Sequence, residues 1–422
     1  MPTLHRGINL SFQTPADASY FFGYYDKSPI CALGKKLLAH RVKFEGRDIT
    51  STDYTEVGYF DLSSNDEWNT IGKTEAFNWQ QGSMLQWVGP DFKTKVLFND
   101  RENNSFCSRL VDIKSNTSRV VAHPVYCTHP NGKLALSVNA ERHYFCRAYH
   151  YQGVVNSKWN CPVHDEDGLY QVDLSEGTKK RIVSTRAIAE RSTYPITETD
   201  FHWLEHLWPN PSGSRFLFMH RWGVGENFKT NLYSADFDGG NIYKYSSDYI
   251  YSHLAWKDDK NFTVWTEKQN AMHATRVRAY LQQPWWYKPT RAAYRTIKKI
   301  CFPVKGRLQG SYLNIIDQST SINALGSRHL TENGHPSWTS DGRFFLTDTY
   351  QDADNYRHLI LYDSEKDVSY KLGLFYSRYN DSSFRCDLHP RFSFDNNKII
   401  IDTSSRFPRS MLVFDIDWSQ FK

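Results

Sequence analysis

The sequence predicts an all-β protein, a seven-bladed β-propeller that forms a single domain over residues 1–422. A two-part motif recurs seven times, which is typical of four-stranded sheets repeated around an axis. Four of the six intervals between copies suit single blades, which need about 40 to 50 residues each. Aromatic residues, which stacked sheets favour, make up 15% of the chain.

The first part of the motif is an aromatic or apolar start, a polar turn and a strand-like run. Its copies begin at Ser28, Leu85, Thr128, His206, His253, His335 and His389. The second part is an alternating strand that ends in an acidic or polar turn. Its copies span residues 58–61, 110–112, 168–173, 231–236, 312–317, 359–363 and 412–415. Each pair of parts predicts one blade, packed against its two neighbours.

The intervals after Val125 and after His253 are nearly twice the length of a blade. Neither contains both parts of the motif, so we expect insertions around residues 141–166 and 267–310 rather than extra blades. The last copy ends close to the C-terminus, which leaves its blade without an outer strand. Because an unpaired outer strand promotes aggregation, we expect residues 4–12 to supply it.

Composition excludes several classes of protein. The net charge of +5 is mild for this length and no long basic arm is present, which argues against general nucleic-acid binding. The N-terminus lacks the pattern of a secretory signal, and no window approaches the ~20 apolar residues of a membrane span. The seven cysteines have no regular spacing, so we expect reduced thiols and a cytoplasmic protein.

Four of the seven copies begin with histidine at the equivalent position: His206, His253, His335 and His389. In a propeller these positions precede the innermost strands and converge on the central channel. Imidazole is the commonest metal ligand, and Asp387 adds an oxygen two residues before the last histidine. The pattern predicts a shared polar site that holds a divalent metal, Mn or Zn. The alternative is that each histidine only caps its own turn.

These segments resemble the oligogalacturonate lyase family, whose members are seven-bladed propellers acting on uronate oligosaccharides. The matching pieces are residues 206–211 (His-Leu-Trp-Pro-Asn-Pro), residues 253–256 (His-Leu-Ala-Trp) and the His-Pro pairs at His335 and His389. The resemblance implies the fold, an acidic oligosaccharide or polysaccharide as partner, and metal-binding histidines at these positions.

For the metal, the resemblance supports His253 and His389 most directly, with His206 nearby. Two departures stand out. The closely spaced His-Pro-His of the family is Asp387-Leu388-His389 in this chain, and the family's ligand glutamine has no clear counterpart.

The chain also resembles propeller proteins associated with bacterial surface-polysaccharide biosynthesis. The resemblance lies in residues 23–29, 78–82, 85–87 and 385–390. These strings are more distinctive than the blade pattern, and no activity is attached to them. They support a second interpretation, a non-catalytic glycan-binding or scaffold propeller.

β-Elimination on a uronate needs a cation on the carboxylate, a base for the adjacent proton and an acid for the leaving oxygen. A metal ion supplies the first as a Lewis acid. Residues 218–222 offer His220 or Arg221 as the base, and His220 is chemically easier because arginine is rarely deprotonated. Tyr25 or its neighbour Tyr24 supplies the acid. The alternative for His220 and Arg221 is an exposed strand end, and the alternative for residues 24–27 is a turn that leads into the first blade.

Further side chains suit an acidic sugar. The candidates for substrate binding are Lys27, Gln80, Gln81, Arg142, Arg147 and Arg385. Arginine and lysine pair with carboxylates, while glutamine amides bond to sugar hydroxyls. The two glutamines equally suit ordinary packing within a blade.

Two other segments each allow two interpretations. The first insertion contains His143, Cys146, His150, Cys161 and His164. Their spacing resembles a zinc site, but cysteine and histidine alternate instead of forming pairs. Residues 275–307 carry nine basic and no acidic residues, interleaved with aromatic ones. This segment is either a peripheral membrane contact or a lid on the propeller.

We therefore expect a carbohydrate-active protein, most concretely a metal-assisted lyase that acts on a uronate-containing oligosaccharide or polysaccharide. The alternative is the non-catalytic glycan-binding or scaffold propeller of surface-polysaccharide biosynthesis. A protein-interaction scaffold fits less well, because it would not need four aligned histidines.

Overall fold

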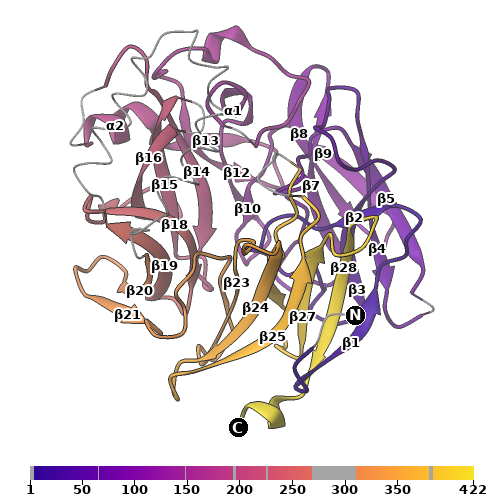
Figure 1. Cartoon of the computed structure of the whole chain (residues 1–422). Coiled ribbons are helices and arrows are strands. Elements are labelled where there is room, and N and C mark those ends of the chain that lie inside the picture. Colours follow the sequence, from indigo (N-terminus) through magenta and orange to yellow (C-terminus); the bar gives the residue numbers. More distant parts are fainter. Residues whose placement is uncertain are drawn as a thin grey trace, which may run out of the picture.

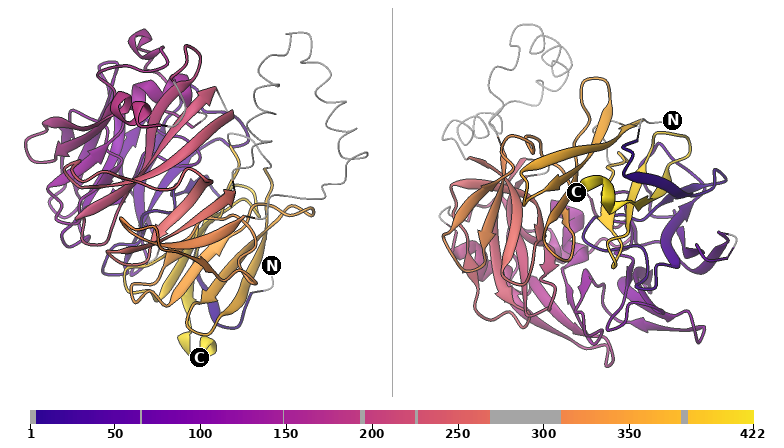
Figure 2. Two further views of the ribbon diagram at one scale, coloured as in Figure 1. Left: turned by 90° about the vertical axis from the view of Figure 1, so that its left-hand side faces the viewer. Right: turned by 90° about the horizontal axis from the view of Figure 1, so that it is seen from below.

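The structure is a computed structural model that describes residues 4–64, 66–147, 149–192, 196–224, 227–268, 310–379 and 384–422. Seven four-stranded antiparallel sheets stand around a central axis, as Figures 1 and 2 show. The predicted seven-bladed β-propeller is therefore confirmed. Among the described residues, no helix is long and apolar enough to cross a membrane.

The strands of the first four blades follow one another in chain order, from the axis outwards. Blade 1 consists of β2 (Ser19–Phe21), β3 (Lys36–Val42), β4 (Thr55–Asp61) and β5 (Trp68–Thr74). Blade 2 consists of β6 (Gln86–Trp87), β7 (Lys95–Glu102), β8 (Ser105–Asp112) and β9 (Thr117–Val121). Blade 3 consists of β10 (Cys127–Thr128), β11 (Leu134–Ser137), β12 (Gly168–Asp173) and β13 (Lys179–Ser184). Blade 4 consists of β14 (Phe201–Pro209), β15 (Arg215–Val224), β16 (Asn227–Asp236) and β17 (Tyr243–Lys244).

Blades 5 and 6 keep the same order. Blade 5 consists of β18 (Tyr249–Trp256), β19 (Asn261–Lys268), β20 (Ser311–Ile316) and β21 (Ile322–Leu325). Blade 6 consists of β22 (Ser337–Trp338), β23 (Phe344–Asp348), β24 (Tyr356–Asp363) and β25 (Val368–Tyr376).

Blade 7 is built from both ends of the chain. Its inner strands are β26 (Arg391–Phe392), β27 (Lys398–Thr403) and β28 (Ser410–Ile416), and its outer strand is β1 (Ile8–Gln13). Strand β1 pairs with β28 in the antiparallel register Ile8 to Ile416. The expected closure by the N-terminal stretch is confirmed, with the strand displaced a few residues along the chain. A short 3-10 helix, η3 (Trp418–Phe421), follows β28.

The core lies between neighbouring blades. One apolar cluster joins Val57 of blade 1, Phe98 of blade 2 and Val413 of blade 7, all fully buried. Alternating apolar residues along each strand supply these contacts, because successive side chains of a strand point to opposite faces of the sheet. Packing of blade on blade thereby holds the ring and its axis in place.

The first insertion, between β11 and β12, contains the helix α1 (Ala140–Cys146) and the 3-10 helix η1 (Ser157–Trp159). The side chain of Asn139 accepts the backbone N–H of Arg142 and so caps α1. A further helix, α2 (Thr185–Glu190), follows blade 3. The predicted second insertion, including residues 275–307, lies outside the described residues except at its edges.

Two of the innermost strands are interrupted by β-bulges. The pairing of β14 with β15 shifts between Glu205 and Trp208, and that of β18 with β19 shifts between Tyr251 and Leu254. His206 and His253 therefore lie in bulges, which re-aim side chains out of the regular ladder. His206 and His389 also have positive φ angles of 56° and 45°. The backbone thus departs from regular strand geometry where the motif places its histidines.

Candidate metal centre and anion-binding face

Residues 22–27 leave the inner edge of blade 1 and cross the central channel. The carbonyl of Gly23 accepts a hydrogen bond from Nδ1 of His389, over 2.6 Å, in blade 7. On the far side, the Tyr25 hydroxyl donates to the carbonyl of Leu254, over 3.2 Å, and accepts from its N–H, over 3.0 Å. The crossing segment is thus fixed to blades 5 and 7, and the Tyr25 hydroxyl is engaged with backbone.

Three of the four predicted histidines meet directly on the axis. The ring centroids of His253 and His335 lie 4.2 Å apart, and those of His335 and His389 lie 4.3 Å apart. The Tyr25 ring lies 5.1 Å from that of His335. His206 is separated from this group by Tyr24, whose ring centroid lies 5.4 Å from both His206 and His389.

Each of the three imidazoles has its Nδ1 engaged. His335 Nδ1 donates to Asp348 over 2.8 Å, and His389 Nδ1 donates to the Gly23 carbonyl. His253 Nδ1 lies 3.0 Å from Oδ1 of Asn333. Because a carboxylate or carbonyl oxygen can only accept, the proton resides on Nδ1 and the lone pair on Nε2. Metal-ligating histidines are commonly oriented in this way.

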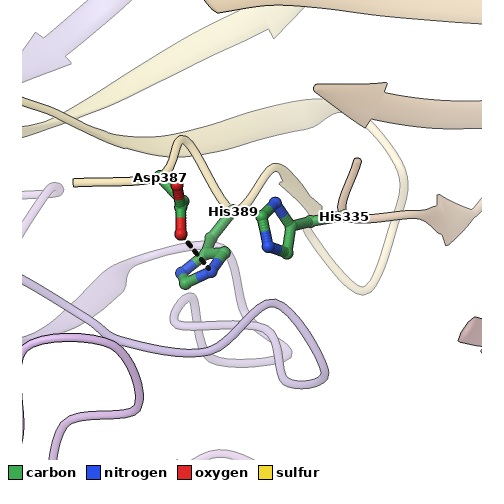
Figure 3. Close-up of side chains that lie close together, drawn as sticks. All are labelled: His335, Asp387 and His389. Carbon is green, nitrogen blue, oxygen red and sulfur yellow. Dashed lines mark ion pairs between the residues drawn. The ribbon is translucent and has the colours of Figure 1, made fainter. Parts of the chain in front are cut away.

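Asp387 lies beside this group (Figure 3). His335, Asp387 and His389 each offer a ligand atom, and the three atoms lie within 4.8 Å of one another. Nε2 of His389 is buried, lies 3.9 Å from the Asp387 carboxylate and has no hydrogen-bond partner among the described residues. A buried ring nitrogen without a donor is the feature a cation would satisfy, so the residues present fit a divalent metal.

The charge of Asp387 is already compensated by two arginines. Its carboxylate pairs with Arg357 over 2.7 Å and with Arg385 over 2.8 Å. Burial raises the pKa of Asp387, but the two guanidinium groups outweigh that effect and hold the pKa well below its usual range. Burial lowers the pKa of His253 and of His335 to about 3, which keeps both imidazoles neutral near neutral pH.

A second charged group adjoins the histidines. Glu205 is fully buried and forms ion pairs with Arg147 and Arg221, and its carboxylate lies 3.7 Å from Nε2 of His206. Burial raises the pKa of Glu205, yet the two arginines bring it well below its usual range. Burial also raises the pKa of Tyr24, on which both arginines and Glu205 act.

The two charged groups are linked through α1 and the chain that follows it. Arg147 donates to the side chain of Gln81 over 2.7 Å and to the carbonyl of Tyr149 over 2.9 Å. Arg385 donates to the Tyr149 hydroxyl over 2.6 Å. Arginines from three parts of the chain thus surround the histidines, which makes this face suited to an anion.

The remaining predicted residues have other partners. His220 is fully buried, with Nε2 3.0 Å from Nδ1 of His202. Arg142 donates to the carbonyls of residues 159, 161, 162 and 202, and so holds the first insertion against β14. Gln80 donates to the carbonyl of Arg385 over 2.7 Å. Lys27 pairs with Asp26. Their predicted roles in catalysis or binding stay predictions.

The zinc-like residues of the first insertion do not converge. Within the part of the chain that the structure describes, the group on the axis is the one that places three ligand atoms together. His143 Nε2 lies 3.2 Å from the carbonyl of Leu204, and His150 Nδ1 lies 2.7 Å from the carbonyl of Arg147. These histidines fix the insertion to the propeller.

Sequence reasoning missed Asp348, Glu205, Asn333 and Arg357. None occupies a position that the repeat marks. Asp348 ends β23 and Arg357 is the second residue of β24, so only the pairing of these strands brings them to the axis. Glu205 directly precedes His206, and that adjacency is a signal that could have been used.

None of the known protein-family models matches the chain, and no curated protein sequence matches it. Solved structures do resemble it. An oligogalacturonate lyase in complex with manganese is 13% identical with a TM-score of 0.65, over 100% of this chain and 98% of that one. The oligogalacturonate lyase of Vibrio parahaemolyticus is 13% identical with a TM-score of 0.62, over 100% and 97%. The chain therefore has the propeller fold of these lyases.

Proposed function

We propose that this protein is a metal-assisted lyase that acts on an acidic, uronate-containing oligosaccharide or polysaccharide. The observation that carries the proposal is the pair of imidazoles of His335 and His389. Both have Nδ1 engaged, each offers a ligand atom within 4.8 Å of the other and of the Asp387 carboxylate, and Nε2 of His389 has no partner among the described residues. The arginines around them supply the positive face that a uronate requires.

His335, His389 and Asp387 would hold the metal, with His253 in contact with His335. Imidazole and carboxylate ligands suit Mn or Zn. When bound, such an ion supplies Lewis-acid polarisation of the substrate carboxylate. Arg221 and Arg147 add binding of the substrate's charge. Because Arg221 is paired with a buried carboxylate, we assign it to binding rather than to proton abstraction.

Geometry favours different proton-transfer residues from those that the sequence suggests. His220 is enclosed with His202, whereas His206 lies beside Glu205 and Tyr24 on the histidine face. Burial lowers the pKa of His206 well below its usual range and keeps its imidazole neutral, while the adjacent Glu205 carboxylate acts in the opposite direction and would stabilise a proton taken up by the ring. We assign the acid role to Tyr24, because the hydroxyl of Tyr25 is engaged with backbone.

The test is metal content and lyase activity of the wild type and of a His335→Ala, His389→Ala double variant. We expect near-stoichiometric metal after loading with Mn or Zn, and release of unsaturated products from oligogalacturonate, both lost in the variant. A His129→Ala variant serves as the control, because that histidine bonds within a turn after β10. Wild-type protein that binds neither metal after loading would overturn the proposal.

A non-catalytic glycan-binding propeller is the second candidate. It is favoured by the two arginines that already neutralise Asp387, which weakens the need for a metal there. This candidate requires that acidic oligosaccharides bind equally well with and without a chelator, and that no product forms.

A further inference from the structure

The channel has a second compartment on the other side of the crossing segment. A cavity of about 210 Å³ opens there, lined by residues of blades 1, 2, 3, 4 and 7. Trp208 lines this cavity together with Asp26 and Lys27, which end the crossing segment. The ring centroid of Trp208 lies 4.8 Å from that of Tyr25, whose ring also contacts His335. The crossing segment therefore separates this cavity from the histidines.

The cavity contains one pair of opposite charges, Asp26 and Lys27. The two side chains are 4% and 11% exposed. Oδ1 of Asp26 is buried and has no hydrogen-bond partner among the described residues. The Lys27 ammonium, besides its pairing with Asp26, lies 5.4 Å from the centre of the Tyr126 ring. A buried carboxylate oxygen without a donor is costly, so Asp26 keeps an unused acceptor at the wall of the cavity.

The chemistry of the lining selects the class of ligand. The Asp26–Lys27 pair is neutral as a whole, and the other described residues that line the cavity are uncharged. An ion of either sign would be repelled by the member of the pair that carries the same charge. A hydroxyl group suits the pair, because it donates to the carboxylate and accepts from the ammonium. Aromatic rings of Trp208, Phe92 and Phe394 offer flat apolar walls, and the last two lie 5.0 Å apart at their centroids.

We propose that this cavity is a second ligand site, which binds a neutral pyranose sugar. Lys27 and Asp26 bond to its hydroxyls, and Trp208 and Phe394 cover its apolar face. Phe394 is 42% exposed, which is high for a phenylalanine and leaves its ring accessible to such a ligand. The site does not depend on the metal, nor on the lyase activity proposed for the opposite face.

The test is binding of D-glucose, D-galactose and N-acetyl-D-glucosamine, measured by saturation-transfer NMR and calorimetry on the full chain with a chelator present. We expect saturable binding of at least one sugar. The Asp26→Asn, Lys27→Met double variant removes both charges together and should weaken binding roughly tenfold or more, as loss of charge-assisted hydrogen bonds does.

A second variant does not threaten folding. Phe394→Ser replaces an exposed ring and should also weaken binding, whereas Tyr376→Ser, equally 42% exposed but on β25, should not. The proposal is overturned if none of the three sugars binds the wild type. It is equally overturned if binding is as strong in the Asp26→Asn, Lys27→Met double variant as in the wild type.

Discussion

Asp348 accepts two hydrogen bonds from His335, one from ring Nδ1 over 2.8 Å and one from the backbone N–H over 2.7 Å. Its other oxygen accepts the backbone N–H groups of Leu388 and His389, over 3.1 and 3.2 Å. One carboxylate at the end of β23 thereby fixes the start of blade 7 and orients an imidazole of blade 6. The candidate metal centre depends on this carboxylate for its geometry, because Asp348 positions the His335 ring.

Replacing Asp348 by Asn should weaken metal binding by on the order of 10- to 100-fold, because the amide cannot accept all four N–H groups and frees the His335 ring. Titration with Mn, followed by calorimetry, measures the change. The matched control is Asp352→Asn, which removes an exposed carboxylate that bonds to His358 Nε2 over 2.9 Å. Equal effects of the two substitutions would contradict the orienting role.

Glu205→Gln should destabilise the fold strongly, by about 3–5 kcal/mol, because it leaves Arg147 and Arg221 without their buried counter-charge. The measurement is the free energy of unfolding in urea. Glu166→Gln, which breaks an exposed ion pair with Lys158, should change that free energy by less than about 1 kcal/mol. A Glu205→Gln protein as stable as the wild type would show that the two arginines do not need this carboxylate.

His40 should make the protein less stable in mild acid. Burial lowers its pKa to about 4, and both ring nitrogens are engaged, Nε2 accepting the N–H of Ser83 over 3.0 Å. The unfolded chain, with a pKa near 6.5, takes up the proton first as the pH falls. The contribution of the neutral ring to stability is therefore complete above about pH 6.5 and is lost on the way down to about pH 4.

For one such group, the loss between about pH 7 and about pH 5 is on the order of 1–2 kcal/mol. A His40→Gln variant should start less stable at neutral pH and then lose less on acidification than the wild type. Urea unfolding at the two pH values tests this. Parallel losses in both proteins would assign the acid sensitivity to other groups.

Deleting residues 1–13 removes β1 and exposes the edge of β28. We expect aggregation and a lower melting temperature, because an unpaired strand edge recruits other chains. A synthetic peptide of residues 4–13 should restore a monomeric state, whereas a scrambled peptide should not. Light scattering with and without each peptide measures the effect. A deletion protein that stays monomeric and stable would mean that β1 is dispensable.

The fold was predictable because it repeats. Seven copies of one motif indicated the number of blades, and the missing outer strand of the last copy pointed to the N-terminus. The histidines were predictable for the same reason, since His253, His335 and His389 occupy one position of the motif and meet on the axis.

What the repeat could not reveal are the partners that come from elsewhere in the blades. Asp348 reaches the axis through the pairing of β23, and Glu205 is placed by a bulge that shifts the register of β14. The hydroxyl of Tyr25 finds the backbone of Leu254, which is 229 positions away. Contacts of this kind depend on the closed ring, which no local pattern encodes.

The shared blade also sets the order of events when the chain is made. Ser11 on β1 bonds to the carbonyl of Val413 on β28, 402 positions later. During synthesis the first strand emerges long before its partner exists, so the nascent chain can assemble six complete sheets while the ring remains open. Closure then brings together the segments with the greatest separation in sequence, so we expect it to be late and slow. Until then, the N-terminal segment needs protection from pairing with a neighbouring nascent chain.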